Sequence, residues 1–192
     1  MTGFGKSDKM AYPYSLDDYV KEIYFLISAL NVEKYSIVAH SFGARVAIKL
    51  SLIDKRVDKL ILTGAAGLKP KRSLKYYFKV YVYKLLKKFV KKDRIKSFGS
   101  SDYKTLSPVM KESFVKIVNE HLDGIANGVK NKTLILHGEL DRETPLYMAK
   151  RYNKKIKNST LKVLKGSGHF AFIDDPVSFN YYLTKFLGDG NV

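Results

Sequence analysis

The stretch SIVAHSFGARVAI, residues 36–48, joins an apolar run typical of a buried strand to a run typical of a helix, with Ser41 at the junction. Small residues stand two positions before and two positions after this serine, at Ala39 and Gly43. A sharp strand-to-helix turn needs small side chains there, and it would strain Ser41 and expose its hydroxyl. Ser41 is therefore our candidate nucleophile. An ordinary strand-to-helix turn with a polar residue would show the same pattern. The rest of the sequence is therefore needed to distinguish a nucleophile from an ordinary turn residue.

Strand-like and helix-like segments alternate on both sides of this turn. Ser15 is expected to cap a first helix that has Asp17 and Asp18 in its first turn, where negative charge suits the helix dipole. Strands are expected over 35–39, 57–63, 133–136 and 160–164, and later helices over 42–52, 145–156 and 176–187. This alternation predicts an α/β fold with a mostly parallel sheet.

Two amphipathic helices interrupt the alternation. The first is expected over 74–89, where apolar and aromatic residues recur at helical spacing opposite a row of lysines. The second is expected to start at Ser107 and Pro108, because proline suits the first helical position. Its inward residues should be Met110, Phe114, Ile117 and Val118. We therefore expect residues 1–66 and 130–192 to form an α/β core and residues 67–129 to be an inserted helical lid.

The positive charge of the chain is concentrated in the segment that contains the first of these helices. The 192 residues carry a formal net charge of +17, and residues 69–97 hold twelve Lys and Arg against one acid, Asp93. No nucleic-acid-binding signature accompanies them, so we expect no nucleic-acid partner. A solvated helix face is the first interpretation. Weak contact with an anionic membrane surface is the second, because basic amphipathic helices with aromatic residues bind such surfaces.

Composition and residue spacing argue against several kinds of site and segment in this chain. The chain has no cysteine, which removes disulfides and thiolate metal sites, and its four histidines lack metal-ligand spacing such as H-E-x-x-H. We therefore assign no metal and no cofactor. No apolar run is long enough to span a bilayer, and the start at Met1 does not resemble a signal peptide. We expect a soluble cytoplasmic protein, and its oligomeric state stays open.

An acid and a base follow two later strands of the predicted sheet. Asp141 comes after the strand expected over 133–136, and His169 after the strand expected over 160–164. A serine hydroxyl becomes a strong nucleophile when a histidine takes its proton, and that histidine needs a carboxylate to hold its tautomer. Ser41, Asp141 and His169 therefore stand in the order nucleophile, acid, base.

Other residues compete for two of these roles. Glu139 and Glu143 lie in the same loop as Asp141 and could serve as the acid instead. A loop histidine bonded only to backbone is the alternative for His169. The other three histidines are interpreted as non-catalytic. We expect His40 to shape the pocket, His137 to be structural, and His121 to be a partly buried residue of the second lid helix.

Four motifs in order resemble the α/β-hydrolase fold family. They are the G-x-G-x-S-D and Y-S-L-D-D segments over 3–8 and 14–18, the elbow over 39–43, the G-x-x-D-x-x-x-P loop over 138–145, and the G-H-x loop over 168–170. The resemblance implies Ser41 as nucleophile, Asp141 as acid and His169 as base, with the Phe42 N–H as an oxyanion donor. Serine at the nucleophile position argues against the epoxide-hydrolase and haloalkane-dehalogenase branches, which have aspartate there.

The sequence departs from that family at its start. Family members begin with further strands and a loop, often H-G-x-x-G, that supplies a second oxyanion donor, and the 192 residues contain no such motif. We therefore expect the second donor to be absent from this chain, as in a fragment or a reduced family member. Losing one donor lowers turnover by about 100- to 1,000-fold, so we expect weak activity. Missing strands would also leave a sheet edge and an apolar face exposed, so we expect poor solubility.

Three functions are compatible with these residues. The first is a serine hydrolase that cleaves a small carboxylic ester or related acyl compound through an acyl-enzyme. The second uses the same triad for C–C bond hydrolysis or acyl transfer, which the lid pocket would decide. The third is a non-catalytic remnant or binding module. The lid residues carry no recognisable code for a particular substrate.

Overall fold

The computed structural model describes residues 1–71 and 106–188. The first lid helix expected over 74–89, with its cationic face and its suggested membrane contact, lies outside the described residues. The second lid helix lies within them.

The described residues contain one sheet of four parallel strands, in the order β1-β2-β3-β4. The strands are β1 Tyr35–His40, β2 Val57–Thr63, β3 Lys132–Gly138 and β4 Ser159–Leu164. In the register, His40 pairs with Thr63, and Gly138 pairs with Leu164. The parallel α/β prediction is therefore confirmed. Because all strands run the same way, the loops after β1, β3 and β4 meet at one edge of the sheet.

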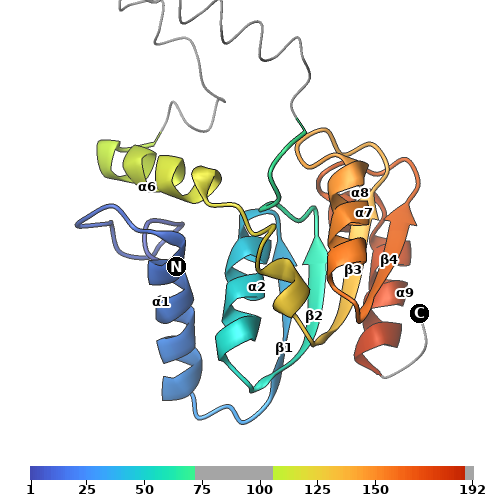
Figure 1. Ribbon diagram of the computed structural model, residues 1–192, viewed down its shortest axis with the longest axis horizontal. Helices are drawn as coiled ribbons and strands as arrows, with labels where there is room; N and C mark the ends of the chain where they lie inside the picture. The colour runs from blue at the N-terminus through green and yellow to red at the C-terminus, as the bar shows by residue number, and fades with distance from the viewer. Residues whose placement is uncertain (72–105, 189–192) are drawn as a thin grey trace, which may run out of the picture.

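Helices cover both faces of this sheet (Figure 1). One core cluster packs α1 (Leu16–Ala29), α2 (Phe42–Ile53) and α7 (Leu146–Lys155) against one face. A second cluster packs α8 (Ala171–Asp174) and α9 (Pro176–Leu187) against the other. β2 serves both faces, because Leu60 and Leu62 belong to the first cluster and Ile61 belongs to the second.

The two expected helix starts are confirmed. Ser15 caps α1 in a capping box with Asp18. The helix α6, Pro108–Asn119, begins at the predicted proline, and the Ser107 side chain accepts from the Met110 N–H. Figure 1 shows α6 lying across the ends of α1 and α2, on the side of the sheet where the strands end.

Two short elements and one residue differ from the sequence-based expectation. The 3-10 turn η1 (Ala126–Gly128) and the one-turn helix α8 have too few residues to show a period, so the sequence pattern did not predict them. His121 was expected on the second lid helix, and this was wrong. The helix ends at Asn119 because Glu120 leaves helical geometry, with φ −80° and ψ 114°.

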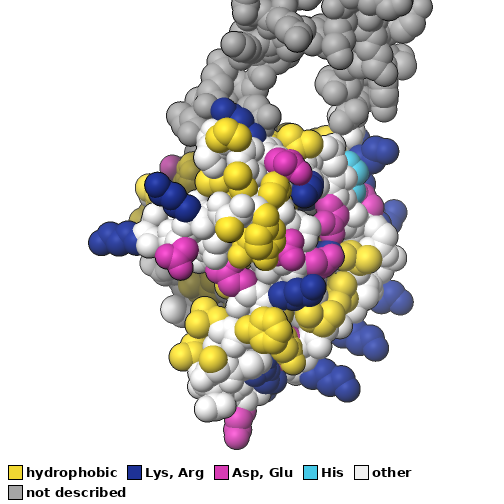
Figure 2. All heavy atoms as spheres, turned by 90° about the vertical axis from the view of Figure 1, so that its left-hand side faces the viewer, with side chains coloured by type: hydrophobic (Ala, Val, Ile, Leu, Met, Phe, Trp, Pro, Cys, Tyr) yellow, Lys and Arg dark blue, Asp and Glu magenta, His cyan; other side chains and the backbone are white. Residues whose placement is uncertain are grey.

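An apolar surface lies on the side of the molecule that carries α1 and β1 (Figure 2). β1 is an edge strand of the four-stranded sheet, and its Val38 is 52% exposed. Phe25 on α1 is 66% exposed, and Leu30, directly after α1, is 61% exposed. Within the described residues, this side therefore presents both an open strand edge and exposed apolar side chains.

Asp54, at the carboxyl end of α2, connects this helix to β1 through hydrogen bonds. It is buried, and its carboxylate accepts from Tyr35 Oη at 2.8 Å, Arg56 Nε at 3.0 Å and the Arg56 backbone N–H at 2.9 Å. The Arg56 side-chain bonds, helped by the Arg56 amide and Tyr35, hold the pKa of Asp54 to about 2, although burial acts in the opposite direction.

We expect Asp54→Asn to lower the free energy of unfolding at pH 7 by about 1–3 kcal/mol, because a charged hydrogen-bonding partner is lost. The folded pKa of Asp54 is depressed, so its contribution is present above the unfolded pKa of about 3.9. That contribution disappears as the pH falls through about 2. Urea denaturation at pH 7 and at pH 2.5 should show the two proteins converging.

The control is Asp58→Asn, which removes a surface pair with Lys34 and should change stability by less than about 1 kcal/mol. An Asp54→Asn effect that is equal at both pH values would contradict the expected ionic contribution.

Candidate active site

Ser41 lies in a strained turn between β1 and α2. Its backbone has φ 50° and ψ −111°, in the left-handed half of conformational space that favours glycine. Three hydrogen bonds hold it there. The Ser41 N–H donates to the Thr63 carbonyl at 3.0 Å, and the Ser41 carbonyl accepts from the N–H groups of Ala44 at 3.1 Å and Ala66 at 3.2 Å. Such strain costs roughly 1–3 kcal/mol, so the surrounding structure must impose it.

The residues around Ser41 have the sizes and positions that the elbow requires. A Cβ added at Gly43 would lie 3.8 Å from the Cβ of Ala39, in ordinary van der Waals contact, so the two positions face each other with room for no more than small side chains such as alanine. Phe42 is the first residue of α2, and its N–H therefore has no acceptor within the helix. An N–H at the positive end of the helix dipole can stabilise an anion beside Ser41.

Asp141 is a buried carboxylate in the loop after β3. Its Oδ1 accepts from the N–H groups of Glu143 and Thr144, both at 2.9 Å, and its Oδ2 accepts from Thr144 Oγ1 at 2.8 Å. The same Oδ2 lies 2.9 Å from His169 Nδ1. Burial favours protonation, but the hydrogen bonds from His169 and Thr144 outweigh it and lower the pKa of Asp141. An ionised Asp141 makes Nδ1 the donor and leaves Nε2 to accept a proton.

His169 is held against Asp141 because the loops after β3 and β4 touch along their backbones. The Leu140 N–H donates to the Ser167 carbonyl at 2.8 Å. A Cβ added at Gly138 would lie 2.0 Å from the Gly168 carbonyl oxygen, so only glycine allows this approach. At the end of β2, Gly64 has φ 49°, and a Cβ there would lie 3.0 Å from the His169 ring.

The alternative acids lie elsewhere. Glu139 is exposed, and its Oε2 accepts from the Gly166 N–H at 3.2 Å, so it joins the two loops. Glu143 approaches the other side of the base, with Oε2 3.3 Å from His169 Nε2 and its side chain 67% exposed. The structure therefore brings Asp141, and neither glutamate, to His169 Nδ1. The catalytic roles themselves remain predictions.

Two of the other three histidines lie beside this pair. His40 Nε2 lies 3.0 Å from the His169 carbonyl oxygen, and the two rings are 4.6 Å apart. His137 is completely buried, with Nε2 3.7 Å from Asp141 Oδ2. Burial lowers the pKa of both His40 and His137, so both are neutral at pH 7. Each packs behind one member of the Asp141–His169 pair, and His121 lies just past the end of α6.

Ser41 lines two adjoining cavities. The first, which we call the open cleft, has a volume of about 680 Å³ and also contains His40, Glu143, His169 and Phe170. The second, which we call the apolar pocket, has a volume of about 300 Å³. Its lining residues besides Ser41 are Phe4, Met10, Tyr19, Phe42, Arg45, Ala66, Leu106, Met110, Ser113, Phe114, Ile117 and Val118. All four residues expected on the inner side of the second lid helix therefore line the apolar pocket.

Thr144 and Arg45 are site residues that the sequence pattern did not single out. Thr144 could have been found, because a threonine three positions after an aspartate often closes a hydrogen-bonded turn with it. Arg45 gives no such signal, because its hydrogen-bond partners are carbonyl groups 72 and 75 positions later.

Residues 1–71 and 106–188 contain no group of three or more His, Asp or Glu that could hold a metal ion. No helix in this part of the chain has the length and apolar character needed to cross a membrane.

The strain at Ser41 predicts an unusual stability order. We expect Ser41→Gly to be more stable than Ser41→Ala by about 1 kcal/mol, because glycine relieves the positive φ and alanine keeps it. At Ser51, inside α2, the order should be reversed, with glycine less stable than alanine by about 1 kcal/mol. Chemical denaturation of all four variants measures both differences. The same sign at both positions would show that Ser41 is not strained.

This chain is similar to known proteins over most of its length. A family model described as the alpha/beta hydrolase fold matches residues 1–94 and 69–176. The AB hydrolase superfamily protein YisY of Bacillus subtilis (strain 168) is 29% identical, over 97% of this chain and 78% of its own length. The 2-hydroxy-6-oxo-2,4-heptadienoate hydrolase of Pseudomonas putida is 25% identical, over 97% of this chain and 76% of its own length.

A solved structure is similar over the whole chain. The meta-cleavage product hydrolase CumD of Pseudomonas fluorescens IP01 has a TM-score of 0.71 and 27% identity, with 100% of this chain and 78% of that protein covered. The family model, these relatives and the parallel sheet lead to one conclusion. This chain belongs to the α/β hydrolase fold family.

Proposed function

We propose that this protein is a cofactor-independent serine hydrolase that cleaves a carboxylic ester or related acyl compound. The observation that carries the proposal is the 2.9 Å contact between buried Asp141 Oδ2 and His169 Nδ1, with Ser41 in the same cleft. Membership of a hydrolase family supports the reaction class. The positive φ of Ser41 supports its role as the nucleophile, because backbone strain clusters at active sites.

The reaction would proceed in two halves. His169 Nε2 removes the Ser41 hydroxyl proton as Oγ attacks the substrate carbonyl carbon, and Asp141 stabilises the resulting imidazolium. The Phe42 N–H stabilises the oxyanion. His169 then protonates the leaving alcohol, and the acyl group stays on Ser41 Oγ. In the second half, His169 activates a water molecule, which releases the acid and restores the serine.

The lining of the apolar pocket favours a substrate with an uncharged acyl group. Among its described lining residues, Arg45 is the one charged side chain, and its Nη1 already donates to the Ile117 and Glu120 carbonyls at 2.9 and 2.6 Å. A carboxylate on the acyl chain would therefore have to share the one guanidinium of this pocket with these two carbonyl groups. Burying an unpaired charge costs several kcal/mol, so an aliphatic or aromatic acyl group fits better.

Hydrolysis of a C–C bond is the second candidate. Two similar proteins are named for it: a 2-hydroxy-6-oxo-2,4-heptadienoate hydrolase and a meta-cleavage product hydrolase. The first substrate name describes a ketone that also carries a carboxylate. The same serine, histidine and aspartate could serve that reaction, and the two candidates differ in whether the pocket accepts the carboxylate.

Covalent labelling tests the nucleophile. A fluorophosphonate probe should label the protein once, at Ser41, and Ser41→Ala should abolish the labelling. His169→Gln should slow it by about 100- to 10,000-fold, because the general base is lost. Ser36→Ala, which changes an exposed serine of β1, is the matched control and should label normally. Labelling that persists in Ser41→Ala would show that another residue is the nucleophile, and an unlabelled parent protein would favour a non-catalytic binding module.

A pair of esters of equal length tests the substrate class. We expect p-nitrophenyl hexanoate to be cleaved with a kcat/KM at least 100-fold above that of the analogue whose acyl chain ends in a carboxylate, a ratio worth roughly 3 kcal/mol. Steady-state rates at pH 7.5 measure the ratio. A preference for the carboxylate, together with turnover of a 2-hydroxy-6-oxo-dienoate, would favour the second candidate instead.

A further inference from the structure

Two basic residues of α2 hold the end of α6. Arg45 stands four residues after Ser41 and Lys49 stands eight residues after it, so both lie on one face of α2, one and two turns from the serine. Arg45 is buried, and its Nη1 donates to the carbonyl oxygens of Ile117 at 2.9 Å and Glu120 at 2.6 Å. These carbonyls lie in the last turn of α6 and just beyond it.

Lys49 extends the connection to a third helix. Its Nζ lies 2.6 Å from Glu120 Oε1 and 2.5 Å from Asp17 Oδ1, which belongs to the first turn of α1. The Lys49 side chain is 17% exposed, and these two carboxylates raise its pKa although burial acts in the opposite direction. The ammonium therefore ties α1, α2 and the end of α6 together.

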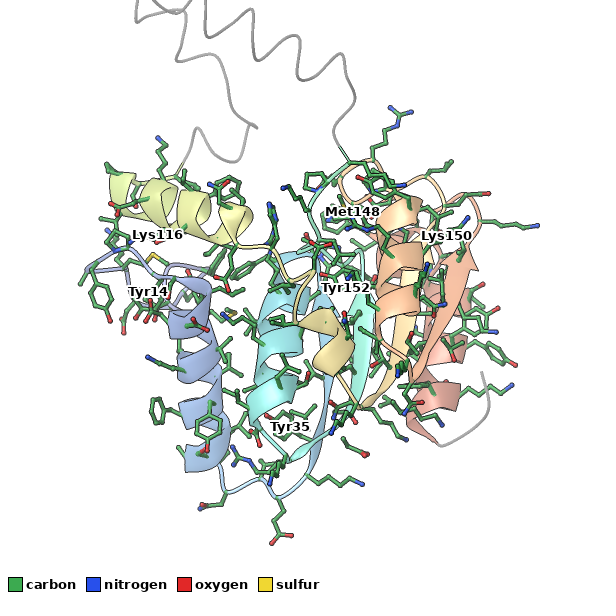
Figure 3. The ribbon with its side chains drawn as sticks, viewed as in Figure 1. Tyr14, Tyr35, Lys116, Met148, Lys150 and Tyr152 are labelled. Atoms are coloured by element: carbon green, nitrogen blue, oxygen red, sulfur yellow. The ribbon has the colours of Figure 1, made fainter. Side chains whose placement is uncertain are left out.

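The Arg45 contacts are difficult to break. Carbonyl groups at the end of a helix carry the negative end of its dipole, so a cation there is stabilised. If α6 moved away, the buried guanidinium would lose two acceptors and remain charged, because arginine does not deprotonate in proteins. The amino-terminal side of α6 is also held, since the Tyr14 N–H, beside α6 in Figure 3, donates to Ser113 Oγ at 2.8 Å.

The position of α6 determines one wall of the apolar pocket. Met110, Phe114, Ile117 and Val118 of α6 line that pocket together with Ser41. Arg45 belongs to the same helix as the elbow, so it fixes the distance between this wall and the serine. We propose that Arg45 and Lys49 are positioning residues that hold α6 and thereby set the size of acyl group that reaches Ser41.

This inference rests on the proposed function for the identity of its substrate. Whether Arg45 and Lys49 hold α6 in place can be measured without any substrate. In Arg45→Met and Lys49→Met, amide deuterium uptake over 114–120 should rise at least about 10-fold, with that of 176–187 in α9 nearly unchanged. Methionine keeps the unbranched apolar stem and removes the charge. Lys150→Met, an exposed lysine of α7 labelled in Figure 3, is the matched control and should leave both segments unchanged.

The kinetic readout separates positioning from general damage. We expect the KM for p-nitrophenyl hexanoate to rise at least about 10-fold in Arg45→Met and in Lys49→Met. In Lys49→Met, whose altered side chain does not line the pocket, kcat for p-nitrophenyl acetate should change less than about 3-fold, because uniform binding is lost and the chemistry is kept. Arg45→Lys should recover part of the KM, since one ammonium can reach a carbonyl but lacks the planar fork. If Arg45→Met fails to fold, Lys49→Met and Glu120→Gln provide the same comparison.

The outcomes distinguish this inference from the proposed function. A parent protein that is not labelled at Ser41 contradicts the proposed function, and deuterium uptake alone then decides whether the two residues hold α6. A labelled parent whose variants keep the same ratio of hexanoate to acetate KM overturns the inference. Equal loss of both activities would also overturn it, because that result indicates a purely structural role.

Discussion

The backbone hydrogen bonds that hold Ser41 at a positive φ are the constraint on which the rest of the site depends. The Ser41 amide and carbonyl are bound by residues at and after the end of β2, so the turn is built only when β1 and β2 pair in parallel. This turn also starts α2 at Phe42, whose N–H therefore has no acceptor within the helix. Sheet register, helix start and anion-binding geometry are thus consequences of one arrangement.

The acid and base depend on a second close approach, at the same edge of the sheet. β3 and β4 end in register at Gly138 and Leu164, and the loops that follow touch through backbone atoms where only glycine fits. This contact places a buried carboxylate beside Nδ1 of a histidine that would otherwise be on a separate loop. A parallel sheet supplies such convergence because every strand delivers its following loop to the same side.

Much of this could be predicted from the sequence where the signal is local. Small residues around Ser41, a proline at the start of α6, and loops rich in glycine after apolar runs each have a nearby physical cause. The strands and most helices were therefore predicted to within one or two residues. The resemblance to a family then ordered Ser41, Asp141 and His169, although each motif alone is weak.

The features that sequence did not predict depend on contacts between distant segments. The sequence around Arg45 is that of an ordinary helix residue. Its hydrogen-bond partners, the carbonyl groups of Ile117 and Glu120, come close to it only because the chain folds back onto α2. Tyr152 of α7, labelled in Figure 3, likewise donates to the Ala66 carbonyl at 2.8 Å, across 86 residues. Short elements such as α8 form because tertiary contacts stabilise them, and they lack a period of their own.

The connection through Lys49 implies that ionic strength acts on this molecule unevenly. Its partners Asp17 and Glu120 are 62% and 34% exposed, whereas Arg45 makes its bonds to carbonyl groups in the interior. Dissolved ions weaken exposed charge pairs, with a screening length of about 8 Å at physiological concentration, and they weaken buried pairs much less. Salt would therefore loosen the outer attachment of α6 and keep the inner one, so that the ionic medium could adjust the shape of the pocket without unfolding it.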